Sequence, residues 1–128
     1  EFTAADSNEV QSVVTKAVGE CDALYIPTDN TIANNTEIVK NVAVPAGIPV
    51  VTGEEGMCSG CGLATLSISY YDLGVKAAEM AYEILTNGAD PAQMAIGYVT
   101  DGITEKYNAD IAEALNITIP EDMVAIEN

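Results

Sequence analysis

The residues best suited to bind a ligand follow three apolar runs of the sequence, each at the point where the run ends. A carboxylate can bind an ammonium group, hydroxyl and amide groups can hydrogen-bond, and a tyrosine ring can pack against an aromatic or apolar group. The residues that carry or flank these groups are Thr28, Asp29 and Asn30 after the first run, Glu54, Glu55 and Gly56 after the second, and Ser69, Tyr70, Tyr71 and Asp72 after the third. This set favours the binding of a small polar ligand.

Several kinds of chemistry are excluded by composition. The 128 residues include no histidine, which rules out Ser-His-Asp and Cys-His nucleophiles and most catalytic zinc sites. The net charge is −16, from 20 acidic and four basic residues. That balance argues against binding nucleic acid or an anionic membrane surface, and its simplest role is solubility. We expect no cofactor and no metal.

The three cysteines, Cys21, Cys58 and Cys61, cannot form a disulfide framework because their number is odd. Cys58 and Cys61 have the C-x-x-C spacing of redox pairs and zinc sites. A thioredoxin-type pair lies at a helix N-terminus, whereas Gly62 and a strand-like run follow this one, and no second C-x-x-C completes a zinc site. We therefore expect an unreactive pair without metal, in a loop at residues 53–62.

Short apolar runs alternate with segments of helical periodicity. Strands are expected at residues 22–26, 48–52, 63–68 and 96–100. Helices are expected after a capping box at Asp6 and Glu9, after a cap at Asn30 or Thr31, at residues 71–86 and after a cap at Asn108. Their inward faces would be Val10, Val13, Val14, Ala17 and Val18; Ile38, Val39, Val42 and Ala43; Leu73, Ala77, Met80, Ala81, Ile84 and Leu85; and Ile111, Ala114 and Leu115.

This alternation predicts an α/β fold of three layers, a mostly parallel sheet with helices on both faces and right-handed crossovers. The length suits a single domain. In open parallel sheets, ligands bind beyond the carboxyl ends of the strands, beside the helices that follow. We therefore expect Asp29, Glu54 and Tyr70 to lie on one rim of the sheet.

Each of these residues also has a purely structural interpretation. Asp29 and Asn30 could be helix caps with equal justification. Glu54 and Glu55 could be solvated loop charges, and Tyr70 and Tyr71 could be packing residues. The argument for a site depends on the recurrence of such residues at successive strand ends.

Four stretches together resemble one known family. They are CDALYIPTDN, IPVVTGEEG, GLATLSISYYDLGVKAAEMAYEIL and ALNITIP. They look like the C-terminal part of the substrate-binding lipoproteins of ABC transporters of the tryptophan/tyrosine-binding type, which have the type I periplasmic-binding-protein fold. The resemblance covers nearly the whole chain. Two positions depart from it, since Cys61 stands where the family usually has Gly and Ser69 where Asp is common.

The resemblance implies a ligand held in a cleft between two α/β lobes. It places Thr28, Asp29 and Asn30 on the binding wall of the second lobe and favours Glu54 over Glu55, because the family has Glu in an E-x-G loop that includes Gly56. Tyr70 matches the first aromatic of the family's Y-Y string. Asp29 would bind the ammonium group of an amino acid, whose carboxylate would be bound largely by the other lobe.

The resulting expectation is a solute-binding component and not an enzyme. It would capture an amino acid with an aromatic or apolar side chain and deliver it to an ABC permease. It would be extracytoplasmic, as a cell-surface lipoprotein or a periplasmic protein. The alternatives are the effector-binding domain of a sugar-repressor-like regulator or another doubly wound α/β enzyme domain, which the upstream sequence would distinguish.

The chain starts with Glu-Phe-Thr and holds about one lobe's worth of strands. We therefore expect residues 1–128 to be the C-terminal lobe of a two-lobe protein, excised or mature. Residues 71–96 would pack on the missing lobe in the intact protein. An isolated lobe would expose that helix and could form a homodimer through it.

Overall fold

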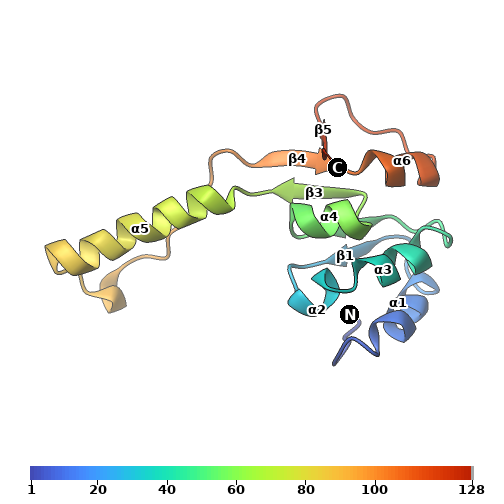
Figure 1. The fold of residues 1–128 in the computed structure, drawn as a ribbon, viewed down its shortest axis with the longest axis horizontal. Helices are drawn as coiled ribbons and strands as arrows, with labels where there is room; N and C mark the ends of the chain where they lie inside the picture. Colours follow the sequence, from blue (N-terminus) through green and yellow to red (C-terminus); the bar gives the residue numbers. More distant parts are fainter. Residues whose placement is uncertain (128) are drawn as a thin grey trace. The chain divides into compact units, whose positions relative to one another are not determined.

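Figure 1 shows the computed structural model, which describes residues 1–127. The chain divides into two units. Unit 1 comprises residues 1–67 and the segment from Thr104 onward, and unit 2 comprises residues 68–103. Unit 1 contains the whole sheet.

The sheet of unit 1 has five strands in the order β1-β2-β3-β4-β5. Strands β1, β2 and β3 are parallel, β4 is antiparallel to β3, and β5 is parallel to β4. This confirms an α/β fold with a mostly parallel sheet. The strand bounds are β1 Leu24–Ile26, β2 Val50–Thr52, β3 Ala64–Ser67, β4 Thr104–Tyr107 and β5 Val124–Ala125.

Helices α1, α3 and α4 form a layer on one face of the sheet, and contacts link α1 to α3, α3 to α4, and α4 to β2 and β3. The core of this layer contains Val10, Val14, Val39, Ala43, Val50 and Cys61. The predicted inward faces of α1 and α3 are therefore confirmed. The helices of unit 1 are α1 Val10–Val18, α2 Asn30–Ala33, α3 Thr36–Ala43, α4 Glu55–Cys61 and α6 Ala109–Leu115.

The opposite face of the sheet is covered only in part. A second core cluster around Ile111 of α6 includes Ala64 and Tyr107, which share a face with Val51 by their register. The large side chains Tyr25, Val51 and Leu66 of that face are exposed. Within α6, Ala112 is buried and Ala114 is exposed, so the predicted inward position of Ala114 is wrong by two residues.

The expectation of a loop at residues 53–62 is also wrong, because α4 occupies most of this segment. Glycines made the segment resemble a loop, since glycine disfavours helix. Three features of the structure compensate for the low helix propensity of these glycines. Glu54 caps the helix, Met57, Cys58 and Cys61 are buried, and Gly60 lets α3 approach closely, since a Cβ there would lie 2.4 Å from Thr36 Oγ1.

The first two helices begin differently from the prediction. Helix α1 starts at Val10, and Asp6 accepts a hydrogen bond from the Asn8 amide at 2.8 Å instead of capping the helix. Glu9 does reach back, but to the Ala5 amide at 2.9 Å. The second predicted helix is two helices, α2 and α3. Its cap is Asp29, and neither Asn30 nor Thr31.

Unit 2 consists of the long helix α5, Tyr70–Asn87, the short helix η1, Pro91–Gln93, and an extended segment. Helix α5 ends at Gly88, whose φ of 69° is left-handed, a conformation that glycine adopts readily at a helix end. None of the residues of α5 is buried. The predicted strand at residues 96–100 is not present in the structure, and Ile96 and Tyr98 are exposed.

A physical reason accounts for that missing strand. A β-strand exists only where a neighbouring strand accepts its backbone hydrogen bonds. Among the described residues, no strand pairs with this segment. Instead the segment lies along α5. The short distances at Gly97 show this, since a Cβ there would lie 2.8 Å from the sulfur of Met80 and 3.3 Å from Lys76.

Candidate ligand-binding site at the strand ends

The loops that follow β1 and β2 lie in direct contact. Ile26 pairs in register with Thr52, and the amide of Gly53 donates to the carbonyl of Ile26 at 2.9 Å. A Cβ on Gly53 would lie only 2.7 Å from the Thr28 nitrogen, so this close approach requires glycine. The carboxyl ends of the two strands therefore bring Asp29 and Glu54 to the same edge of the sheet, as the sequence predicts.

We call the residues of unit 1 that follow β1 and β2 at this edge the strand-end site. Its members are Thr28, Asp29, Asn30, Glu54 and Gly56. All except Glu54 are exposed, and Glu54 is half-buried. The structure therefore brings together five of the six residues that the sequence singles out.

Asp29 serves as the N-cap of α2. Its Oδ1 accepts a hydrogen bond from the Ile32 amide at 2.9 Å. Asp29 therefore does cap a helix. This cap uses one hydrogen bond, however, and a carboxylate can accept about four. The side chain is exposed at the edge of the sheet, so capping and ligand binding are compatible.

Glu54 caps α4 in the same way. It accepts hydrogen bonds from the amides of Gly56, at 2.7 Å, and Met57. A Cβ on Gly56 would lie 3.1 Å from Glu54 Oε2, so Gly56 allows the carboxylate to fold over the helix start. The Thr52 hydroxyl donates to the Glu54 carbonyl at 3.1 Å and fixes the turn between β2 and α4.

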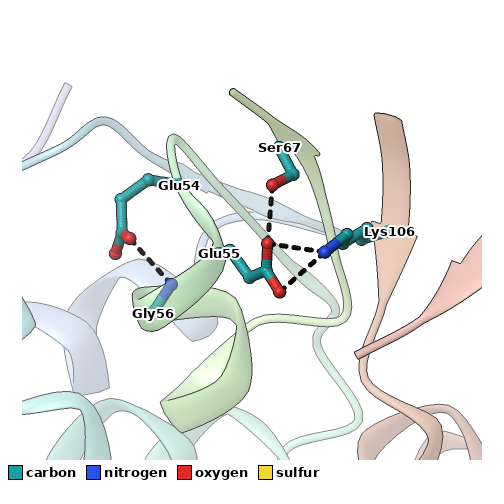
Figure 2. Close-up of polar contacts among 5 residues, drawn as sticks. All are labelled: Glu54, Glu55, Gly56, Ser67 and Lys106. Atoms are coloured by element: carbon teal, nitrogen blue, oxygen red, sulfur yellow. Dashed lines mark hydrogen bonds and ion pairs between the residues drawn. The ribbon is translucent and has the colours of Figure 1, made fainter. Parts of the chain in front are cut away.

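Glu55 has different partners, which Figure 2 shows beside Glu54. Lys106 of β4 donates to both Glu55 carboxylate oxygens at 2.8 Å. The hydroxyl of Ser67, the last residue of β3, donates to Oε2 at 2.6 Å. The hydrogen bonds from Lys106 and then Ser67 lower the pKa of Glu55 below its usual value, so Glu55 is ionised and already paired.

Sequence reasoning missed Lys106. Its strand was not among the predicted strands, and one lysine within Thr-Glu-Lys-Tyr carries no motif. The signal that could have found it is scarcity, because Lys106 is one of only four basic residues in the chain. In so acidic a protein, a half-buried lysine is expected to have a specific carboxylate partner.

Tyr70, the sixth candidate, belongs to unit 2. It is the first residue of α5, and its side chain is exposed. Ser69 caps α5 by accepting from the Asp72 amide at 3.1 Å. The structure therefore does not place Tyr70 among the residues of the strand-end site, and its part in ligand binding stays a prediction.

Cys58 and Cys61 lie in the middle and at the end of α4, with buried side chains. Burial raises the pKa of Cys58 to about 11 and that of Cys61 to about 12. Both thiols are free, and burial leaves them protonated and unreactive at neutral pH. Between residues 1 and 127 no group of three or more potential metal-ligating side chains occurs. The expectation that the pair binds no metal stays a prediction.

Comparison with known proteins identifies relatives over nearly the whole chain. A family model described as ABC transporter substrate binding protein matches residues 1–127. A curated tyrosine-binding protein from Clostridioides difficile strain R20291 is 44% identical over 79 residues, which are 62% of this chain and 23% of the relative.

Three solved structures are similar to this chain. One is the ligand-free, open structure of a substrate-binding protein with adhesive properties from Clostridium difficile (36% identity, TM-score 0.72, 97% of this chain and 42% of that one). The second is an ABC domain in complex with L-Trp from Streptococcus pneumonia (32% identity, TM-score 0.82, 98% of this chain and 43% of that one). The third is a conserved domain protein from Vibrio cholerae (30% identity, TM-score 0.81, 98% of this chain and 43% of that one). The chain thus spans less than half the length of each.

Proposed function

The chain belongs to the family of ABC transporter substrate-binding proteins, and from this membership we propose that the intact protein captures an amino acid and delivers it to a membrane permease. The proposed ligand has an aromatic or apolar side chain. Support comes from the relatives, one of which is a tyrosine-binding protein and another of which was solved with L-Trp.

The observation that carries the proposal is the placement of two exposed or half-buried carboxylates, Asp29 and Glu54, on adjacent loops at the carboxyl ends of parallel strands. An amino acid needs an anionic partner for its ammonium group. Lys106 of β4 is already held by Glu55. The strand-end site therefore suits the ammonium end of the ligand.

The carboxylate of the ligand needs other partners. We assign these to the remainder of the intact protein, because this chain spans 42–43% of its solved relatives. In this proposal unit 1 is the core of the C-terminal lobe. Residues 71–96, within unit 2, pack on the other lobe, and Tyr70 contacts the aromatic part of the ligand.

A protein with this role binds its ligand without altering it, so the proposal includes no catalytic residue. Substrate-binding proteins of ABC transporters work outside the cytoplasm, and we place the intact protein there, as a cell-surface lipoprotein or a periplasmic protein. Among residues 1–127, no helix has the length and apolarity needed to cross a membrane.

The test uses isothermal titration calorimetry of the intact protein with tyrosine, tryptophan and phenylalanine. Asp29→Asn is the informative variant, because asparagine caps a helix as well as aspartate does but lacks the charge. We expect Asp29→Asn to lose roughly 2–4 kcal/mol of binding free energy with little change in thermal stability.

The matched control is Asp22→Ala, which removes an exposed acid that precedes β1, at the other end of the strand. Its affinity should equal that of the wild type. An unchanged affinity for Asp29→Asn would make Asp29 a helix cap without a role in binding. Absence of binding to all three amino acids would contradict the proposed ligand class.

A further inference from the structure

Glu55 joins two strands that are far apart in the sequence. Its Oε2 accepts from Ser67 of β3 at 2.6 Å, and both oxygens accept from Lys106 of β4 at 2.8 Å. The Ser67 residue is buried, and the side chains of Lys106 and Glu55 are 26% and 38% exposed. We call these three residues the Glu55 clamp (Figure 2).

The clamp lies where the chain leaves unit 1 and returns to it. Ser67 is the last residue of unit 1 before residues 68–103 begin, and Thr104 is the first residue after them. Ser67 and Thr104 are register partners in the antiparallel pair β3–β4, as are Thr65 and Lys106. The clamp therefore fixes the first turn of α4 to both strands that connect unit 1 with unit 2.

The first turn of α4 also carries Glu54, the neighbour of Glu55. Two adjacent carboxylates repel each other, and the ammonium group of Lys106 removes this repulsion by neutralising one of them. It also holds the Glu55 carboxylate against β3 and β4. Glu54 is then the glutamate of this turn that remains for a ligand, with its carboxylate fixed on the amides of Gly56 and Met57.

We propose that Lys106 is a positioning residue of the ligand site, which holds Glu55 on β3 and β4 and thereby fixes the turn of α4 from which Glu54 faces the ligand. This inference rests on the proposed function. It goes beyond it by giving a role to a strand that contributes no residue to the strand-end site.

The test replaces Lys106 by methionine in the intact protein, which keeps most of the side-chain length and removes the charge. Two properties are measured, the affinity for tyrosine by calorimetry and the hydrogen exchange of the Gly56 and Met57 amides by mass spectrometry. We expect Lys106→Met to bind about tenfold more weakly and to exchange these amides faster. Lys106→Arg should keep the wild-type affinity and the wild-type exchange rates, because arginine also forms a bidentate pair with a carboxylate.

The chain offers a matched control in Lys16 of α1, an exposed lysine whose Nζ lies 5.9 Å from the centroid of the Phe2 ring. Lys16→Met should change neither property. Should Lys106→Met fold poorly, Ser67→Ala removes a single hydrogen bond of the clamp and should cause a smaller change in the same direction.

The outcomes separate this inference from the function on which it rests. Wild-type affinity and unchanged amide exchange in Lys106→Met would overturn the positioning role. Weaker binding that Lys106→Arg does not restore, with unchanged exchange, would also overturn it and indicate direct contact with the ligand. If the wild type binds no aromatic amino acid, the proposed ligand is wrong, while the exchange measurement still decides whether Lys106 fixes α4.

Discussion

At the scale of single residues, identical side chains next to each other have different surroundings. Glu54 caps α4, whereas Glu55 is bound by Lys106 and Ser67. The difference arises because successive residues at a helix start point in different directions, one toward the helix axis and one toward the strands. Two measurements at this scale test the consequences for Glu55 and for the cysteines.

Glu55→Gln should lower the free energy of unfolding by roughly 0.5–1 kcal/mol at neutral pH, a modest value because the side chain is partly solvated. The folded-state pKa of Glu55 lies below its ordinary value of 4.5. Its contribution to stability is therefore present above that ordinary value and disappears as the pH falls through the lowered folded-state pKa.

Urea unfolding of the wild type and Glu55→Gln near pH 7 and near pH 3 measures this difference. The two proteins should converge at the acidic pH. Glu79→Gln, which removes the exposed partner of Lys76, serves as the control and should match the wild type at both. A difference between wild type and Glu55→Gln that is equal at both pH values would show that the charge of Glu55 is not its source.

The cysteines should differ in reactivity toward iodoacetamide. With a pKa of about 11 for Cys58 and about 12 for Cys61, at most about one thiol in a thousand is ionised at pH 8. Cys21 is partly exposed. Mass spectrometry should therefore detect one modification in the native chain, at Cys21, and three in urea. Rapid native labelling of Cys61 would contradict the burial of α4.

At the scale of elements, α4 is positioned by close contacts that glycine permits. Gly60 lies against Thr36 at the start of α3, and Gly62 lies against Thr52 of β2. The buried side chain of Asn108 donates to the carbonyls of Cys58 and Ser59 at 3.2 and 2.9 Å and caps α6. These contacts fix the helix whose first turn carries Glu54.

Gly60→Ala should destabilise the protein by about 1–3 kcal/mol, because the new methyl group would overlap Thr36 and force α3 and α4 apart. The control is the same substitution at Gly74 of α5, where a Cβ would meet nothing within 4 Å. Gly74→Ala should instead stabilise by roughly 0.5–1 kcal/mol, since alanine favours helix. Urea unfolding of both variants of the 128-residue chain measures the signs, and a loss of similar size in both would contradict the packing argument.

At the scale of the whole molecule, the chain leaves much apolar surface in contact with water. Helix α5 has no buried residue, Leu85 is 84% exposed, and Tyr25 and Leu66 of the sheet are exposed as well. Soluble proteins rarely leave such surfaces uncovered. The chain also spans less than half of its solved relatives, which fits with these surfaces being covered in the intact protein.

We therefore predict that the isolated 128-residue chain binds tyrosine and tryptophan weakly or not at all. A binding pocket typically encloses about 70–90% of a small ligand, and the strand-end site alone leaves one side open. Calorimetry of the chain beside the intact protein measures the loss. Micromolar binding by the monomeric chain would show that it is a complete binding domain.

The same chain should self-associate through α5. Sedimentation velocity should show a concentration-dependent dimer, and Leu85→Lys should shift it toward monomer by placing a charge on the exposed stripe. Thr86→Lys, at the neighbouring exposed position, is the control and should leave association unchanged. A wild-type chain that remains monomeric at high concentration would refute association through this helix.

The sequence by itself determined the features that depend on local pattern. The inward faces of α1 and α3 and the cap Asn108 are found as predicted, and α5 covers the predicted residues 71–86, although none of its residues is buried. The expectation that parallel strands end at one edge of the sheet also placed Asp29 and Glu54 together. These features are readable because helix faces, caps and strand alternation depend on residues within a few positions of one another.

Only the tertiary structure decided the rest. Helix α4 exists despite its glycines because α3 and the sheet approach it closely. Residues 96–100 are not a strand because none of the strands within residues 1–127 pairs with them. Lys106 reaches Glu55 from 51 positions away in the sequence. Packing, strand pairing and charge pairing of this kind join residues whose distance in the sequence says nothing about their distance in space.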